Sequence, residues 1–88
     1  TYGVRLDPCT QALSLIGSQE GLAHLLMAVA DPGDSILMLD VAYPSYFGAV
    51  QIAGLVPTYI PCDRDTWLPD WSQVSPAAAQ RCTCLLLN

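Results

Sequence analysis

Short apolar runs bounded by turn-forming residues alternate along the chain with segments whose apolar residues recur at helical spacing. The runs are typical of buried strands and predict four of them, at 12–16, 35–39, 56–60 and 83–87. The segments between them predict three helices, at 19–30, 45–53 and 71–81. The resulting order, β-α-β-α-β-α-β, is typical of an α/β protein with a largely parallel sheet. Because the runs do not alternate with polar residues, we expect helices on both faces of that sheet.

Turn signals fix several of the predicted boundaries. A Pro-Gly pair at the centre of 31–34 suits a type II turn, which ends the first helix. Gly54 is the C-terminal signal of the second helix. Pro57 lacks a backbone N–H, which argues against a central position in the sheet for its strand.

Composition predicts that the chain is part of something larger. Of its 88 residues, 52% are hydrophobic and only 12% are charged, which is too apolar for a free-standing small domain. The chain begins at Thr1 rather than at a methionine, and it ends at Asn88 directly after an apolar run. We therefore expect a fragment of one domain.

The charge distribution narrows the possible partners. The net charge is −5, and the three cationic residues, Arg5, Arg64 and Arg81, are scattered. Nothing here forms the basic patch that binds nucleic acid. No apolar run reaches the roughly 18 residues of a membrane span, and no signal-peptide pattern is visible. We expect neither a nucleic-acid partner nor a membrane partner.

The four cysteines, Cys9, Cys62, Cys82 and Cys84, include no C-x-x-C pair, and the chain has a single histidine. A zinc site is therefore not expected, because the ligand spacing is missing. Thiols that pack as small hydrophobic side chains are the simpler interpretation, and they suit a reducing cytoplasm. Cys82 and Cys84 lie two apart at the start of a predicted strand, so both are expected on one face. His24 lies in the middle of a predicted helix and is expected to be structural.

The join between the first predicted strand and helix, from Gly17 to Gly21, has the chemistry of an anion site. Gly17 allows a sharp turn and close approach of a ligand, and Ser18 can be the helix N-cap or offer its hydroxyl to a ligand. The N–H groups of Ser18, Gln19 and Glu20 point off the helix start, where the dipole favours phosphate. The carboxylate of Glu20 must then face away. An ordinary capped helix start is the alternative, and neither nucleotide-binding glycine motif is present.

The join between the second predicted strand and helix, at 40–45, is expected at the same edge of the sheet, where α/β proteins bind ligands. Pro44 fits the first helical position and stiffens the loop. Tyr43 then projects from the edge, where its ring can stack on a flat ligand. The alternative is that Tyr43 packs on the neighbouring helix, a role for which Tyr46 and Phe47 are better suited.

The stretches GSQEGLAHL, DPGDSILMLDVAYPSY and the terminal LLLN together resemble the large domain of class I/II aminotransferases, which are fold-type I pyridoxal-phosphate enzymes. The resemblance runs through the whole chain and points to the branch with LL-diaminopimelate, alanine and aspartate aminotransferase-like members. The Pro-Gly-Asp turn, followed by a strand and then Tyr-Pro-x-Tyr, is the most specific combination. The resemblance implies that residues 1–88 are the phosphate-binding part of that domain.

The resemblance also implies roles for individual residues. Ser18 and Gln19 match the loop that binds the phosphate of pyridoxal 5'-phosphate, mainly through backbone N–H groups, and Gly17 precedes them as the turn residue. Tyr43 matches the aromatic residue that stacks on the pyridine ring. The Val-Ala pair before it departs from the Pro-Gly or Pro-x that relatives often have, which affects the loop shape.

The chain contains no lysine, since all three of its cationic residues are arginines. Family members carry further on an Asn-Pro motif, an aspartate on the pyridine nitrogen, the Schiff-base lysine and a substrate-binding arginine. Asn88 matches the opening of the Asn-Pro stretch and receives no ligand role. The resemblance implies a homodimeric aminotransferase that moves an amino group between an amino acid and a 2-oxo acid. Without the lysine, the chain alone has no catalytic residue and is expected to be inactive.

Two other functions remain open from the sequence. An aminotransferase-like sensor domain of a transcription regulator predicts a winged-helix segment upstream of Thr1. A different α/β ligand-binding domain that uses the same anion turn predicts neither an Asn-Pro motif nor a lysine downstream.

Overall fold

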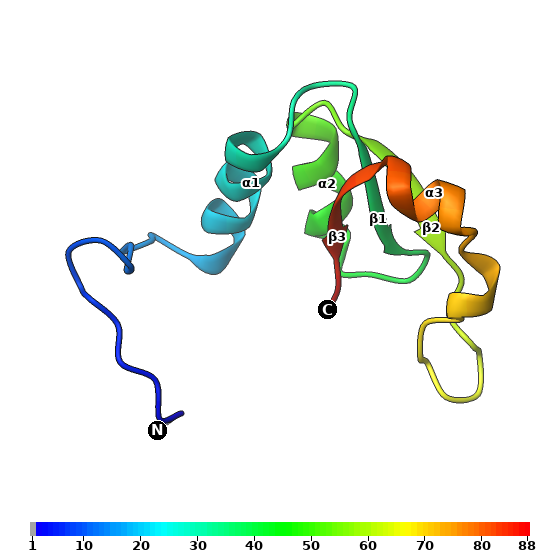
Figure 1. Cartoon of the computed structure of the whole chain (residues 1–88), viewed down its shortest axis with the longest axis horizontal. Helices are drawn as coiled ribbons and strands as arrows, with labels where there is room; N and C mark the ends of the chain where they lie inside the picture. The colour runs from blue at the N-terminus through cyan, green and yellow to red at the C-terminus, as the bar shows by residue number, and fades with distance from the viewer. Residues whose placement is uncertain (1) are drawn as a thin grey trace.

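The structure, a computed structural model, describes residues 2–88 and has a parallel sheet between helices (Figure 1). In chain order the elements are α1 (Ser18–Val29), β1 (Ser35–Leu39), α2 (Pro44–Ile52), β2 (Val56–Ile60), the 3-10 helix η1 (Trp71–Gln73), α3 (Pro76–Arg81) and β3 (Cys82–Leu86). The strand order is β2-β1-β3, and both pairings are parallel. The expected α/β class with a mostly parallel sheet is confirmed.

β1 lies at the centre of the sheet because its side chains are apolar on both faces. Ile36 and Met38 are fully buried in the core that α1 and α2 form over one face. Leu37 and Leu39 are buried on the opposite face, where Val74 packs against them from the segment between η1 and α3. Burial of each such side chain contributes about 1.5–3 kcal/mol. The expectation that both faces are covered is confirmed for this strand.

The predicted turn signals are confirmed. The N–H of Asp34 donates to the carbonyl of Asp31 at 3.0 Å, and Gly33 has a φ of +95°, as a type II turn requires. Gly54, with a φ of +72°, follows α2 as its C-terminal signal. Pro57 lies in β2, which is an edge strand.

The strand predicted at 12–16 is wrong, because residues 2–17 contain neither helix nor strand. Leu13 and Ile16 are 84% and 98% exposed, whereas a buried strand would cover both. A strand needs a neighbour for its backbone hydrogen bonds, and the described sheet offers this segment none. Leu15 instead lies against α1, so close to Gly21 that a Cβ there would come within 2.2 Å of it. Periodicity alone does not separate such a run from a strand.

The helix predicted at 71–81 is divided into η1 and α3. A proline disfavours the helical conformation at the residue before it, and Ser75, before Pro76, is extended with φ of −68° and ψ of 146°. Its hydroxyl accepts a hydrogen bond from the N–H of Ala78 at 3.1 Å and so caps α3. The Ser75-Pro76 pair therefore divides the predicted helix and begins a second one, α3.

Cys82 and Cys84 pack against opposite cores, so the prediction that they share a face is wrong. Ser35 pairs with Cys82 but Ile36 pairs with Cys84, which leaves Thr83 as an extra residue in β3. Such a bulge changes the alternation of side chains by one position. Cys84 consequently packs with the core under α1 and α2, and Cys82 packs with the core on the other face.

Candidate functional site

The starts of α1 and α2 lie together at the carboxyl end of the sheet (Figure 1). A hydrogen bond joins their first turns, since the hydroxyl of Ser45 donates to Oε1 of Gln19. The two joins singled out from the sequence, 17–21 and 40–45, therefore form one surface. Open α/β sheets bind ligands in this position, outside the carboxyl ends of their strands.

Three backbone N–H groups are open at the start of α1. The first helical hydrogen bond runs from the N–H of Gly21 to the carbonyl of Gly17 at 3.3 Å, and no side chain caps the helix. Within residues 2–88, the N–H groups of Ser18, Gln19 and Glu20 have no acceptor. Gly17 is the N-cap and Ser18 the first helical residue, so the N-cap role considered for Ser18 is wrong.

The carboxylate of Glu20 is held beside the helix by two neighbours. Its Oε2 accepts a hydrogen bond from the N–H of Ile16 at 2.9 Å, and its Oε1 lies 3.5 Å from Nδ1 of His24, one turn further along. In a capping box, a glutamate at the third helical position bonds the N–H of the N-cap residue, whereas Glu20 reaches one residue further back, to Ile16. The acidic side chain therefore satisfies an N–H outside the helix and leaves the three open N–H groups without an internal acceptor.

The two glycines of this join have different roles. Gly17 has a φ of −171°, an extended conformation open to any residue, so the sharp turn expected of it is wrong. A Cβ on Gly17 would meet nothing within 4 Å, which leaves the helix start open to an approaching group. Gly21 is the sterically constrained glycine, because a Cβ there would displace Leu15.

Tyr43 projects from the loop between β1 and α2. It is the N-cap residue of α2, and Pro44 occupies the first turn as predicted. Tyr43 is 58% exposed and meets the ring of Tyr46 edge-on, with 6.0 Å between centroids and 71° between planes. Tyr46 and Phe47 pack against the core, so the packing role falls to them and much of the Tyr43 ring stays accessible.

Asp40 connects the loops that follow β1 and β2. Its Oδ1 accepts a hydrogen bond from the N–H of Cys62 at 2.9 Å, and its Oδ2 lies 3.0 Å from Nη2 of Arg64. In the same loop, the N–H of Thr66 donates to Asp63 and lowers the pKa of that carboxyl. The two Asp40 contacts therefore join the loop after β2 to the segment at 40–45.

Sequence reasoning singled out neither Asp40 nor Ser45. The available signal was their position, because each is a polar residue in a short join directly after a buried strand. Their partners, Arg64 and Gln19, lie 24 and 26 residues away. A pattern search over neighbouring positions does not find pairs of that separation.

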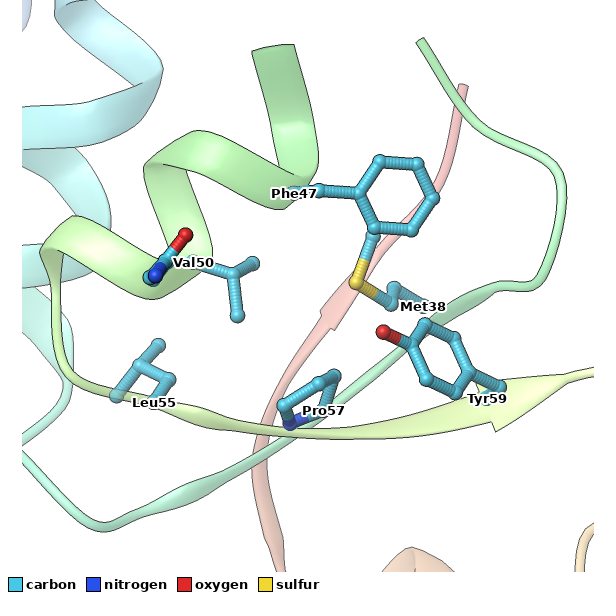
Figure 2. Close-up of a pocket in the computed structure, with 7 residues that line it drawn as sticks. Met38, Phe47, Val50, Leu55, Pro57 and Tyr59 are labelled. Carbon is cyan, nitrogen blue, oxygen red and sulfur yellow. The ribbon is translucent and has the colours of Figure 1, made fainter. Parts of the chain in front are cut away.

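A groove between α2 and β2 has a different character (Figure 2). Its volume is 260 Å³, and Met38, Phe47 and Tyr59 are among its lining residues, none of which is charged. The rings of Phe47 and Tyr59 lie with their centroids 6.3 Å apart. The groove has no charged group to attract an anion, so the candidate site remains the surface at the two helix starts.

Within residues 2–88, no three side chains of the types His, Cys, Asp and Glu come together to hold a metal ion. In the same range, no helix combines the length and the apolar character needed to cross a membrane. Cys9, Cys62, Cys82 and Cys84 are all free thiols.

Known proteins resemble this chain over its full length. The family model described as aminotransferase class I and II matches residues 1–88. LL-diaminopimelate aminotransferase from Desulforudis audaxviator is 40% identical in an alignment of 88 positions, which covers 99% of this chain and 22% of that protein. A probable N-succinyldiaminopimelate aminotransferase from Thermus thermophilus is 52% identical with a TM-score of 0.91, over 99% of this chain and 23% of that one. The apo structure of BacF from Bacillus subtilis matches with a TM-score of 0.87 and 28% identity, and the match covers 99% of this chain and 24% of that one.

The chain spans less than a quarter of the length of each of these relatives. Over that length the match includes the sheet, its flanking helices and both joins at the candidate site. The chain belongs to the class I and II aminotransferase family.

Proposed function

We propose that the full-length protein is a pyridoxal-phosphate-dependent aminotransferase that moves an amino group between an amino acid and a 2-oxo acid. Residues 1–88 are the part of its large domain that holds the cofactor phosphate and ring. Family membership supports the reaction class, and the structure of the two helix starts supports the division of roles within the chain.

The observation that carries the proposal is the open start of α1 beside the exposed ring of Tyr43. The N–H groups of Ser18, Gln19 and Glu20 are donors for a phosphate, and the helix dipole favours its negative charge. The space around Gly17 admits the group without a steric barrier. Tyr43 offers an aromatic face for the pyridine ring. Pyridoxal phosphate supplies the electron-withdrawing ring and the aldehyde that this chemistry requires.

Other parts of the protein must supply the remaining groups. The chain has no lysine, and the reaction needs one to hold the cofactor aldehyde. We propose that this lysine, the aspartate at the pyridine nitrogen and the arginine for the substrate carboxylate follow Asn88, and that the active protein is a homodimer. The four free thiols support a reducing compartment such as the cytoplasm.

The test uses the full-length protein, purified and mixed with pyridoxal 5'-phosphate. We expect a bound-cofactor absorption band, and release of a 2-oxo acid when an amino donor and a 2-oxo acceptor are both present. LL-diaminopimelate is the first donor to try, because a relative is named for it. Absence of both cofactor binding and amino transfer across a panel of amino acids would contradict the proposal. No observation on residues 2–88 favours the alternative of a regulatory sensor domain.

A further inference from the structure

Ser45 connects two parts of the proposed site that are 26 residues apart in the chain. Its hydroxyl donates a hydrogen bond to Oε1 of Gln19, whose backbone N–H is one of the three open donors of α1. Ser45 itself lies two residues after Tyr43. The hydrogen bond thus joins the proposed phosphate-binding turn to the loop that carries the proposed stacking ring.

The local structure sets the position of each partner. Gly17 and Tyr43 are the N-caps, so Gln19 and Ser45 are each the second residue of their helix. Pro44, at the first position of α2, has a fixed φ that orients this first turn. Ser45 is half-buried and Gln19 is exposed, so the serine is the anchored partner and the glutamine is the one whose orientation it fixes.

The direction of the hydrogen bond also determines which end of the Gln19 amide is available. The serine hydroxyl is the donor and Oε1 is the acceptor. The Nε2 group of Gln19 carries two further donors, and within residues 2–88 the hydrogen bond to Ser45 is the one that the Gln19 side chain makes. A side chain held in this orientation presents donors, rather than an acceptor oxygen, beside the open N–H groups.

We propose that Ser45 is a positioning residue of the cofactor site. It fixes the side chain of Gln19 so that Nε2 can donate to the phosphate, and it keeps the start of α1 in register with the Tyr43 ring. This inference rests on the proposed function, because it assumes that pyridoxal phosphate occupies the surface between the two helix starts.

The experiment measures cofactor binding by four single-residue variants of the full-length protein and by the combined Gln19→Ala and Ser45→Ala variant. Ser45→Ala removes the donor, Ser45→Thr keeps a hydroxyl, and Gln19→Ala removes the acceptor. Ser75→Ala is the matched control, because it removes another side-chain hydrogen bond at a helix start, that of α3. For each variant we measure the dissociation constant of pyridoxal 5'-phosphate and the circular dichroism of the bound cofactor.

We expect Ser45→Ala to raise the dissociation constant about threefold to tenfold, the range for one net hydrogen bond, and to change the cofactor dichroism. Ser45→Thr restores both properties, and Ser75→Ala leaves both unchanged. In a Gln19→Ala background, Ser45→Ala has no further effect, because the interaction it removes is already absent. A purely structural role for Ser45 would lower thermal stability without changing the dichroism.

The inference is overturned if Ser45→Ala binds the cofactor like the natural protein, or if its effect persists undiminished in the Gln19→Ala background. Failure of the proposed function gives a different result, since the unmodified protein would then not bind pyridoxal 5'-phosphate at all.

Discussion

The starts of α1 and α3 differ in whether their backbone N–H groups have acceptors. At α3, the hydroxyl of Ser75 accepts from the N–H of Ala78, and Pro76 removes another donor. At α1, Gly17 has no side chain to offer, and three N–H groups are left without an acceptor within residues 2–88. Both helices follow a loop, so the difference between them comes from the residue at the N-cap, which is Gly17 in α1 and Ser75 in α3.

The same difference separates the four described helices into two groups. Asp70 caps η1 through the N–H of Ser72, as Ser75 caps α3, whereas α1 and α2 have no side-chain cap. The two uncapped starts are the pair joined by Gln19 and Ser45. Capping is therefore missing where the proposed cofactor site lies, and present on the helices of the other face.

The largest expected effect comes from removing the open donors of α1. Combined Ser18→Pro and Gln19→Pro changes eliminate two N–H groups that make no hydrogen bond within the helix, and the second proline also disfavours the helical conformation at residue 18. Each charge-assisted hydrogen bond contributes about 1.5–3 kcal/mol, so we expect the full-length protein to bind pyridoxal 5'-phosphate about 10²- to 10⁴-fold more weakly. Titration of the cofactor absorption measures this change.

The matched control replaces both residues by alanine, which removes the side chains but keeps the N–H groups. We expect this variant to lose no more than about tenfold in affinity, the value of the Gln19 side-chain contact. Equal losses in the proline and alanine variants would show that the backbone donors do not hold the phosphate.

A smaller effect is expected at the second uncapped start. Tyr43→Ala removes the exposed ring, and an aromatic contact is worth about 0.5–1.5 kcal/mol. We expect cofactor binding to weaken about twofold to tenfold and the bound-cofactor absorption to shift, whereas Tyr43→Phe keeps the stacking face and both properties. If Tyr43→Ala leaves affinity and absorption unchanged, the ring does not stack on the cofactor.

At the capped start of α3, we expect a substitution to lower stability and to leave cofactor binding unchanged. Ser75→Ala removes the N-cap of α3 and should lower the free energy of unfolding by about 1 kcal/mol, measured from urea unfolding of the full-length protein. The cofactor dissociation constant should not change. A loss of cofactor affinity would mean that the two kinds of helix start are not functionally separate.

The smallest effect is a pH dependence at η1. Hydrogen bonding from the hydroxyl of Ser72 lowers the pKa of Asp70. A lowered pKa in the folded state stabilises the protein above the unfolded pKa of about 4, and this contribution is lost as the pH falls through the folded pKa. Asp70→Asn should therefore reduce the acid sensitivity of the melting temperature below about pH 4. Ser72→Ala should do the same. If the melting temperature of both variants falls with pH below about pH 4 as in the natural protein, Asp70 does not contribute to the acid sensitivity.

Sequence reasoning predicted the elements that have their own local signals. β1 and β2 are bounded by turns that contain Gly33 and Gly54, and the periodicity of α1 is continuous. These signals are encoded within a few residues, so no tertiary information was needed. The open N–H groups of α1 were predicted in the same way, because they follow from any helix start.

The errors arose where the outcome depends on a distant partner. The run at 12–16 has the composition of a strand but no neighbouring strand in the described sheet. The bulge at Thr83 depends on how β3 pairs with β1. The contact between Gln19 and Ser45 depends on the packing of α1 beside α2. Each is a tertiary feature that apolar periodicity does not encode.

The central claim is that the start of α1 binds the phosphate of the cofactor. The most direct measurement compares the affinities of the full-length protein for pyridoxal 5'-phosphate and for pyridoxal, which lacks the phosphate, before and after the combined Ser18→Pro and Gln19→Pro changes. We predict that the preference for the phosphorylated form falls by at least about 10²-fold, while pyridoxal binding is unchanged. An unchanged preference would contradict the account and place the phosphate elsewhere.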